Sequence, residues 1–126
     1  MPPKLANVAV LILDDNPLVL KLGRALLERE GCTVLVAASW IEFNHVLASN
    51  APDIIFLDVN LPSIKGNRLS EVLKSQSSKK DIPIVLISDL PEKSLEEMFP
   101  GSGANAWMRK PLTRDKMVEM INRFVR

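Results

Sequence analysis

The sequence is poor in the residues that build disulfides, zinc sites and membrane spans. Its 126 residues include a single cysteine, Cys32, so no internal disulfide can form. The single histidine, His45, excludes a zinc site built from cysteine and histidine. The apolar run over residues 8–13 is too short to cross a bilayer, and no small-residue cleavage site follows it. We therefore expect a cytoplasmic protein in a reducing compartment.

An excess of charge of one sign is also absent. Sixteen Lys and Arg face fifteen Asp and Glu, which leaves a net charge of +1 and gives no reason to expect nucleic acid or a membrane as partner. The apolar share of 47% and the charged share of 25% are typical of a globular protein. The length allows one domain over residues 1–126, with a core over about 8–125.

Short apolar segments alternate with segments of helical character along the whole chain. The expected strands cover residues 8–13, 33–37, 53–57, 82–87 and 104–108. The expected helices follow Asn16-Pro17, Ser39, Gly66, Asp89-Leu90 and Leu112. Strict alternation predicts an α/β fold, a single doubly wound five-stranded parallel sheet with five helices on its two faces.

Two helices carry more detailed local signals. In the first, Leu18, Leu22, Ala25 and Leu26 recur at helical spacing and predict an apolar face, and Gly31 stops the helix. In the second, Ser39-Trp40-Ile41-Glu42 has the form of a capping box.

Polar side chains follow four of the expected strands. Asp14 and Asp15 follow the first, Asp58 the third, Ser88 the fourth and Lys110 the fifth. Because ligands bind outside the carboxyl ends of the strands in an open parallel sheet, we expect these groups to meet at one edge. Clustered carboxylates repel one another, and a divalent cation removes that repulsion.

Oxygen ligands without cysteine or histidine favour a hard ion, and Mg²⁺ fits a site of carboxylates, water and phosphate. An aspartate beside such an ion can attack phosphorus and form an aspartyl phosphate. Lys110 can offset the charge of the arriving phosphoryl group, and Ser88 can donate a hydrogen bond to it. The residues therefore predict phosphoryl transfer onto a carboxylate.

Four stretches in this order resemble a response-regulator receiver domain of two-component signalling, over nearly the whole chain from about Val8. They are Leu13-Asp14-Asp15-Asn16, Leu57 to Pro62 with Gly66, Leu86-Ile87-Ser88, and Trp107 to Pro111. The resemblance, which is to chemotaxis-type regulators, implies a flavodoxin-like fold with strand order 2-1-3-4-5.

The resemblance also implies the role of each residue in the site. Asp58 would be the phosphoacceptor, and Asp14 and Asp15 the acidic pair, with Asp15 the direct Mg²⁺ ligand. The backbone carbonyl of Asn60 would complete the protein ligands, and Lys110 would pair with the phosphoryl group.

The switch and the partners are implied in the same way. Ser88 would be the switch hydroxyl, Trp107 the switch aromatic, and the bond between Lys110 and Pro111 would be cis. A histidine kinase or histidine phosphotransfer protein would donate the phosphoryl group. A downstream protein or an output domain outside this chain would read the surface of the fourth helix, fifth strand and last helix. The chain would be a monomer, or a weak homodimer through that surface, and no enzyme beyond its own phosphorylation and dephosphorylation.

Two residues depart from the family pattern. Asp89 stands where a small residue is usual, and it either hinders the incoming phosphodonor or caps the following helix. Trp107 is bulkier than the usual aromatic, which restricts its inward position.

Three other functions remain open on the sequence. One is an interaction module that works without phosphorylation. A phosphatase with an aspartate nucleophile ranks lower, because Asn60 stands where a second acid is needed. An FMN site ranks lowest, because the acidic edge would repel the flavin phosphate.

Overall fold

The computed structural model describes residues 5–61, 65–75 and 81–125. Five strands form one parallel sheet in the order β2-β1-β3-β4-β5, as predicted. The strands are β1 (Ala9–Leu13), β2 (Thr33–Ala37), β3 (Ile54–Asp58), β4 (Ile84–Ser88) and β5 (Ala106–Arg109). The helices are α1 (Pro17–Glu28), α2 (Trp40–Ser49), α3 (Gly66–Lys74), α4 (Glu92–Met98) and α5 (Arg114–Phe124), with a short 3-10 turn η1 (Phe99–Gly101) after α4.

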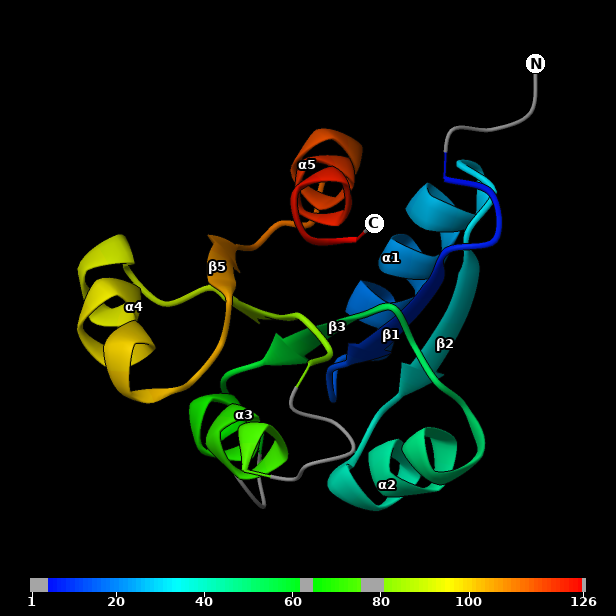
Figure 1. Ribbon diagram of the computed structural model, residues 1–126. Coiled ribbons are helices and arrows are strands. Elements are labelled where there is room, and N and C mark those ends of the chain that lie inside the picture. The colour runs from blue at the N-terminus through cyan, green and yellow to red at the C-terminus, as the bar shows by residue number, and fades with distance from the viewer. Residues whose placement is uncertain (1–4, 62–64, 76–80, 126) are drawn as a thin grey trace.

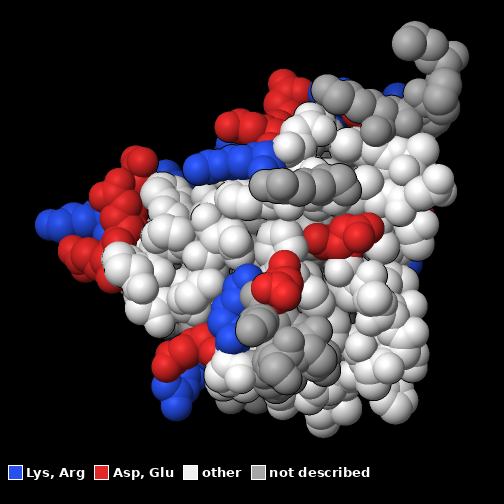
Figure 2. Space-filling model, viewed as in Figure 1, with Lys and Arg blue, Asp and Glu red and all other residues white. Residues whose placement is uncertain are grey.

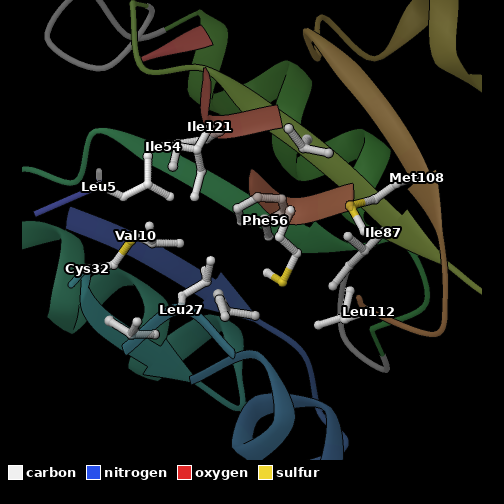
Figure 3. Packing of buried hydrophobic residues seen from close by; sticks show 14 of the residues in the cluster. Leu5, Val10, Leu27, Cys32, Ile54, Phe56, Ile87, Met108, Leu112 and Ile121 are labelled. Carbon is white, nitrogen blue, oxygen red and sulfur yellow. The ribbon is translucent and has the colours of Figure 1, made fainter. Parts of the chain in front are cut away.

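Helices cover both faces of the sheet. Figure 1 shows α1 and α5 on one face and α2, α3 and α4 on the other. Side chains of a strand alternate between the faces, so Ile12 and Phe56 pack under α1 and α5, whereas Leu11 and Leu57 pack under α2 and α3. Figure 3 shows the first of these cores, in which Leu27 of α1 and Ile121 of α5 approach the sheet. Burial on both faces explains why the strands read as continuous apolar runs.

Side-chain caps fix where three helices begin. The Leu18 N–H donates to Oδ1 of Asn16, and Pro17 occupies the first turn of α1, as predicted. The Glu42 N–H donates to Ser39 Oγ, which confirms half of the capping box. The Glu42 carboxylate accepts from the N–H of Ala38, one residue before the expected donor. Thr113 caps α5 by accepting from the N–H of Lys116.

The predicted apolar face of α1 is wrong in part. Leu18 is 73% exposed and Leu22 is 41% exposed, whereas Leu20 and Leu27 face the sheet. Ala25 is also exposed, and Leu26 is half-buried. Gly23 decides the rotation of the helix, because a Cβ there would lie 2.6 Å from Cδ1 of Ile12. Such close approach to β1 fits only glycine without movement of Ile12, so the face of α1 that carries Gly23 packs on the sheet and Leu18 and Leu22 point outward.

Strand boundaries differ from the sequence expectation by one or two residues. Asp53 precedes β3, and its carboxylate accepts the N–H of Ala9. β5 begins at Ala106 because Asn105 instead ties the loop to β4: its N–H donates to Ile84 O and its Oδ1 accepts from Ile84 N–H. Pro62, expected in the loop after the third strand, lies outside the described residues.

Surface charge is mixed on the face that Figure 2 shows. Acidic side chains gather over α4, where Glu92, Glu96 and Glu97 are exposed. The described lysines and arginines form no continuous stripe on this face. Within the described part of the chain, no helix is both long enough and apolar enough to span a bilayer.

Candidate functional site

Three aspartates meet at the carboxyl edge of the sheet, as the strand ends predict. Asp14 and Asp15 follow β1, and Asp58 ends β3, the neighbour of β1. One carboxylate oxygen from each lies within 4.8 Å of the other two. Asp14 is 0% exposed and Asp58 is 3% exposed, whereas Asp15 is open to solvent. The cluster is therefore walled by protein on one side and reached by water on the other.

Lys110 brings the opposite charge to the same place. It follows β5, and its Nζ lies 2.7 Å from Oδ2 of Asp14 and 3.5 Å from Oδ1 of Asp58. The backbone holds this lysine, because its N–H donates to the carbonyl of Ser88 at 2.7 Å. Burial lowers the pKa of Lys110, but the carboxylates of Asp14 and Asp58 outweigh burial and raise it above its ordinary value. The ammonium is therefore a fixed positive charge.

Backbone amides orient both buried carboxylates. The Asn16 N–H donates to Oδ1 of Asp14 at 2.9 Å, and the Asn60 N–H donates to Oδ1 of Asp58 at 3.2 Å. Each contact spans two residues, which is the pattern of an Asx turn. The loops after β1 and β3 thus hold the acids through their own backbone.

Asp58 is an unusually weak acid. Desolvation and the nearby charge of Asp14 raise its pKa to about 6, against an ordinary 3.8. The Asn60 N–H and the Lys110 ammonium act in the opposite direction without cancelling the rise. A carboxylate with this pKa is ionised at neutral pH and holds a charge that the fold leaves only partly compensated.

The residues present fit a hard divalent cation. Oδ2 of Asp14 is buried and accepts no well-aligned hydrogen bond from the described residues, although Lys110 balances its charge. Carboxylates of Asp15 and Asp58 lie beside it, and among the residues that the structure describes no histidine or cysteine joins the cluster. Such an all-oxygen set with one exposed member suits Mg²⁺, which keeps part of its water shell.

Ser88 lies on β4, the strand next to β3, and Trp107 lies on β5, the strand next to β4. Ser88 ends β4 and is 1% exposed, and its Oγ accepts from the N–H of Leu90. Trp107 is half-buried on β5 opposite Leu86, and it borders a cavity of about 300 Å³. Phe99 and Met120 line the same cavity. The peptide bond between Lys110 and Pro111 is cis, as the resemblance implies.

Asp89 does not cap the following helix. The N-cap of α4 is Pro91, and no side chain caps it. The alternative in which Asp89 caps that helix is therefore wrong. Leu90 and Pro91 lie between Asp89 and the first residue of α4, so Asp89 is two residues before the N-cap position. Asp89 instead lines a groove with Lys110, Leu18 and Leu22. The sequence signal for this groove was the surplus of apolar residues on α1.

Comparisons with known proteins agree with this geometry. The model of the response regulator receiver domain family matches residues 10–122. The chain belongs to this family. It is 28% identical over 117 residues to the polar-differentiation response regulator DivK of Brucella ovis, an alignment that covers 93% of this chain and 95% of DivK. The family match confirms the resemblance drawn from the four sequence stretches. Receiver domains are regulatory domains of two-component systems.

Solved receiver structures share the flavodoxin-like fold. The chemotaxis protein CheY4 of Vibrio cholerae matches with a TM-score of 0.86 and 24% identity, over 95% of this chain and 100% of CheY4. The receiver domain of a Pseudomonas aeruginosa sensor histidine kinase matches with a TM-score of 0.83 and 23% identity, over 94% of this chain and 98% of that domain. That structure contains a magnesium ion coordinated in its active-site cleft. At these identities the likeness shows the fold.

Proposed function

We propose that Asp58 accepts a phosphoryl group from a phosphohistidine of a histidine kinase or phosphotransfer protein, in a Mg²⁺-dependent reaction. The observation that carries this proposal is the buried Asp58 carboxylate, with a pKa of about 6, beside two further acids and 3.5 Å from the Lys110 ammonium. A nucleophile that is ionised at neutral pH and next to a fixed cation suits attack on a phosphoryl group.

In the proposed reaction, a carboxylate oxygen of Asp58 attacks phosphorus while the bond from phosphorus to the donor nitrogen breaks. The electron pair of that bond leaves with the nitrogen. Lys110 Nζ, already held at Asp14 and Asp58, offsets the charge that the phosphoryl oxygens bring. Asp14, Asp15, Asp58 and the carbonyl of Asn60 would hold Mg²⁺, which when bound supplies further charge neutralisation.

The proposed output is a change of the surface formed by α4, β5 and α5. Ser88 lies one strand from Asp58, and Trp107 lies on β5 beside the cavity that α5 and η1 border. If Ser88 Oγ turns from the Leu90 N–H to a phosphoryl oxygen, the β4–α4 loop loses one of its ties. A downstream protein, an output domain or a second copy of the chain would then read the altered surface. We place the protein in the cytoplasm, with no turnover of other substrates.

The test is incubation with acetyl phosphate or phosphoramidate and Mg²⁺, followed by intact mass measurement. We expect one added phosphoryl group on the wild type, no addition to Asp58→Asn, and none when Mg²⁺ is chelated. Equal labelling of Asp58→Asn would refute the assignment. Equal affinity of treated and untreated protein for a partner would instead favour an interaction module that works without phosphorylation.

A further inference from the structure

An open groove adjoins the phosphorylation site on the side of α1. It has a volume of about 370 Å³ and is lined by Leu18, Val19, Leu22, Asp89, Lys110, Pro111 and Leu112. Lys110 belongs both to this groove and to the acidic cluster. The groove therefore borders the acidic cluster at Lys110.

Asp89, the acidic residue of this lining, forms no ion pair with Lys110, the basic residue of the same lining. It is exposed, and among the described residues it makes no hydrogen bond or ion pair. Its charge nevertheless acts on Lys110: burial lowers the pKa of that lysine, while Asp14, Asp58 and also Asp89 raise it. The remaining walls, apart from Lys110, are apolar side chains. Asp89 thus places a negative charge in a groove whose walls, apart from Lys110, are otherwise apolar.

We propose that Asp89 is a specificity-determining residue that favours phosphodonors with a protonated nitrogen leaving group over donors with a carboxylate leaving group. This inference rests on the proposed phosphorylation of Asp58. In a transfer with inversion at phosphorus, the leaving group departs on the side opposite the attacking Asp58 oxygen. Asp89 follows β4 at the same carboxyl edge of the sheet and shares the groove with Lys110, so we place the departing group beside Asp89.

The chemistry of the leaving group determines the sign of the effect. With acetyl phosphate, the phosphorus–oxygen bond breaks and acetate leaves with the electron pair, so a second carboxylate develops near Asp89. With phosphoramidate, the phosphorus–nitrogen bond breaks and the protonated nitrogen leaves as neutral ammonia. A phosphohistidine leaves as an imidazole in the same way. Asp89 repels the first kind of donor and attracts the cationic nitrogen of the second.

The size of the effect follows from the charges. One charge acting on a dianion across roughly 8 Å of water changes a rate by about fivefold. Phosphoramidate carries one negative charge fewer at neutral pH, and its positive nitrogen is the part nearest Asp89. We therefore expect the charge of Asp89 to change the rate of phosphorylation by phosphoramidate by no more than about twofold. The useful quantity is the ratio of the two rates, because both reactions use the same Asp58, Lys110 and Mg²⁺.

The experiment compares phosphorylation rates with acetyl phosphate and with phosphoramidate, by intact mass after rapid quenching, for wild type and Asp89→Asn. Asparagine keeps the shape of the side chain and removes its charge. We expect the ratio of the acetyl phosphate rate to the phosphoramidate rate to rise about fivefold in Asp89→Asn at low salt. The rise shrinks at high ionic strength, because the charges lie next to solvent.

Two further variants act as controls. Asp89→Glu retains the charge and should keep the wild-type ratio, whereas Glu96→Gln removes an exposed charge from α4 outside the groove and should also keep it. An unchanged ratio in Asp89→Asn, with both donors still active, overturns the inference and leaves the proposed function intact. If neither donor labels the wild type, both the inference about Asp89 and the proposed phosphorylation of Asp58 are overturned.

Discussion

Two clusters of opposite charges join distant parts of the chain, and they differ in burial. In the site, Lys110 meets Asp14 and Asp58, which are 0% and 3% exposed. At the far end of α1, Arg114 of α5 lies 2.6 Å from the half-buried Glu30 and 3.0 Å from its exposed neighbour Asp115, and Arg114 itself is exposed. The distances are similar, but water screens the second cluster far more than the first. Short ion-pair distances therefore say little about energy without burial.

The largest effect should come from removing the cation of the buried cluster. Lys110→Met leaves the buried Asp14 carboxyl without its partner, and we expect the free energy of unfolding to fall by about 2–3 kcal/mol in chelator at neutral pH. Urea unfolding with and without Mg²⁺ tests this. Mg²⁺ should restore part of the loss, because it supplies positive charge to the same carboxylates. A variant as stable as wild type in chelator would contradict the buried pairing.

Removing the negative charge of Asp58 should raise the free energy of unfolding, the opposite of the effect of Lys110→Met. In the folded protein the Asp58 carboxyl has a pKa of about 6, above its unfolded value of 3.8, so ionisation destabilises the fold. The penalty is absent below pH 3.8, grows as pH rises to 6, and is complete above it. After discounting for solvent screening, we expect Asp58→Asn to stabilise the metal-free protein by about 1–2 kcal/mol at pH 8.

Urea unfolding of both proteins at pH 8 and at pH 4 tests the sign. The advantage of Asp58→Asn should nearly vanish at pH 4, where wild-type Asp58 is protonated in the folded state. If the two proteins differ in free energy of unfolding as much at pH 4 as at pH 8, the charge of Asp58 is not the cause of the difference.

Proton competition should weaken metal binding below the pKa of Asp58. We expect the apparent Mg²⁺ dissociation constant to be nearly constant above pH 7 and to rise roughly tenfold for each pH unit below about 6. Tryptophan fluorescence during Mg²⁺ titration provides the measurement, and isothermal calorimetry checks it without relying on Trp107. An affinity independent of pH between 7 and 5 would contradict this expectation.

The smallest effect should come from the exposed cluster. Arg114→Ala removes the contacts to Glu30 and Asp115, yet we expect no shift of the urea midpoint beyond experimental scatter, at low or high salt. Arg114→Lys serves as the matched control. A loss of stability comparable to that of Lys110→Met would show that burial does not separate the two clusters.

Much of the site could be predicted because it depends on strand ends. Asp14, Asp58, Ser88 and Lys110 were placed at one edge by reading which residue follows each apolar run. That inference needs only the parallel arrangement of the strands, which strict alternation with helices enforces. The roles assigned to these residues stay proposals.

The errors concern orientation. The spacing of Leu18, Leu22 and Ala25 is as helical as that of Leu20 and Leu27, so periodicity did not identify the buried face of α1. Packing of Gly23 against Ile12 decided it. The alternative in which Asp89 caps the next helix failed because α4 begins only after Pro91.

The order of residues along the chain was enough to predict the alternation of elements, the strand order through the family resemblance, and which polar residues reach the edge of the sheet. These follow from local patterns, because each strand must bury two faces and each ends where its polar residue begins. Three features depend on the packed molecule: Lys110 lies closer to Asp14 than to Asp58, Asp58 is a weak acid, and two leucines of α1 border a groove with Asp89. Distances, desolvation and helix rotation arise from packing between segments far apart in the chain, so no local pattern contains them.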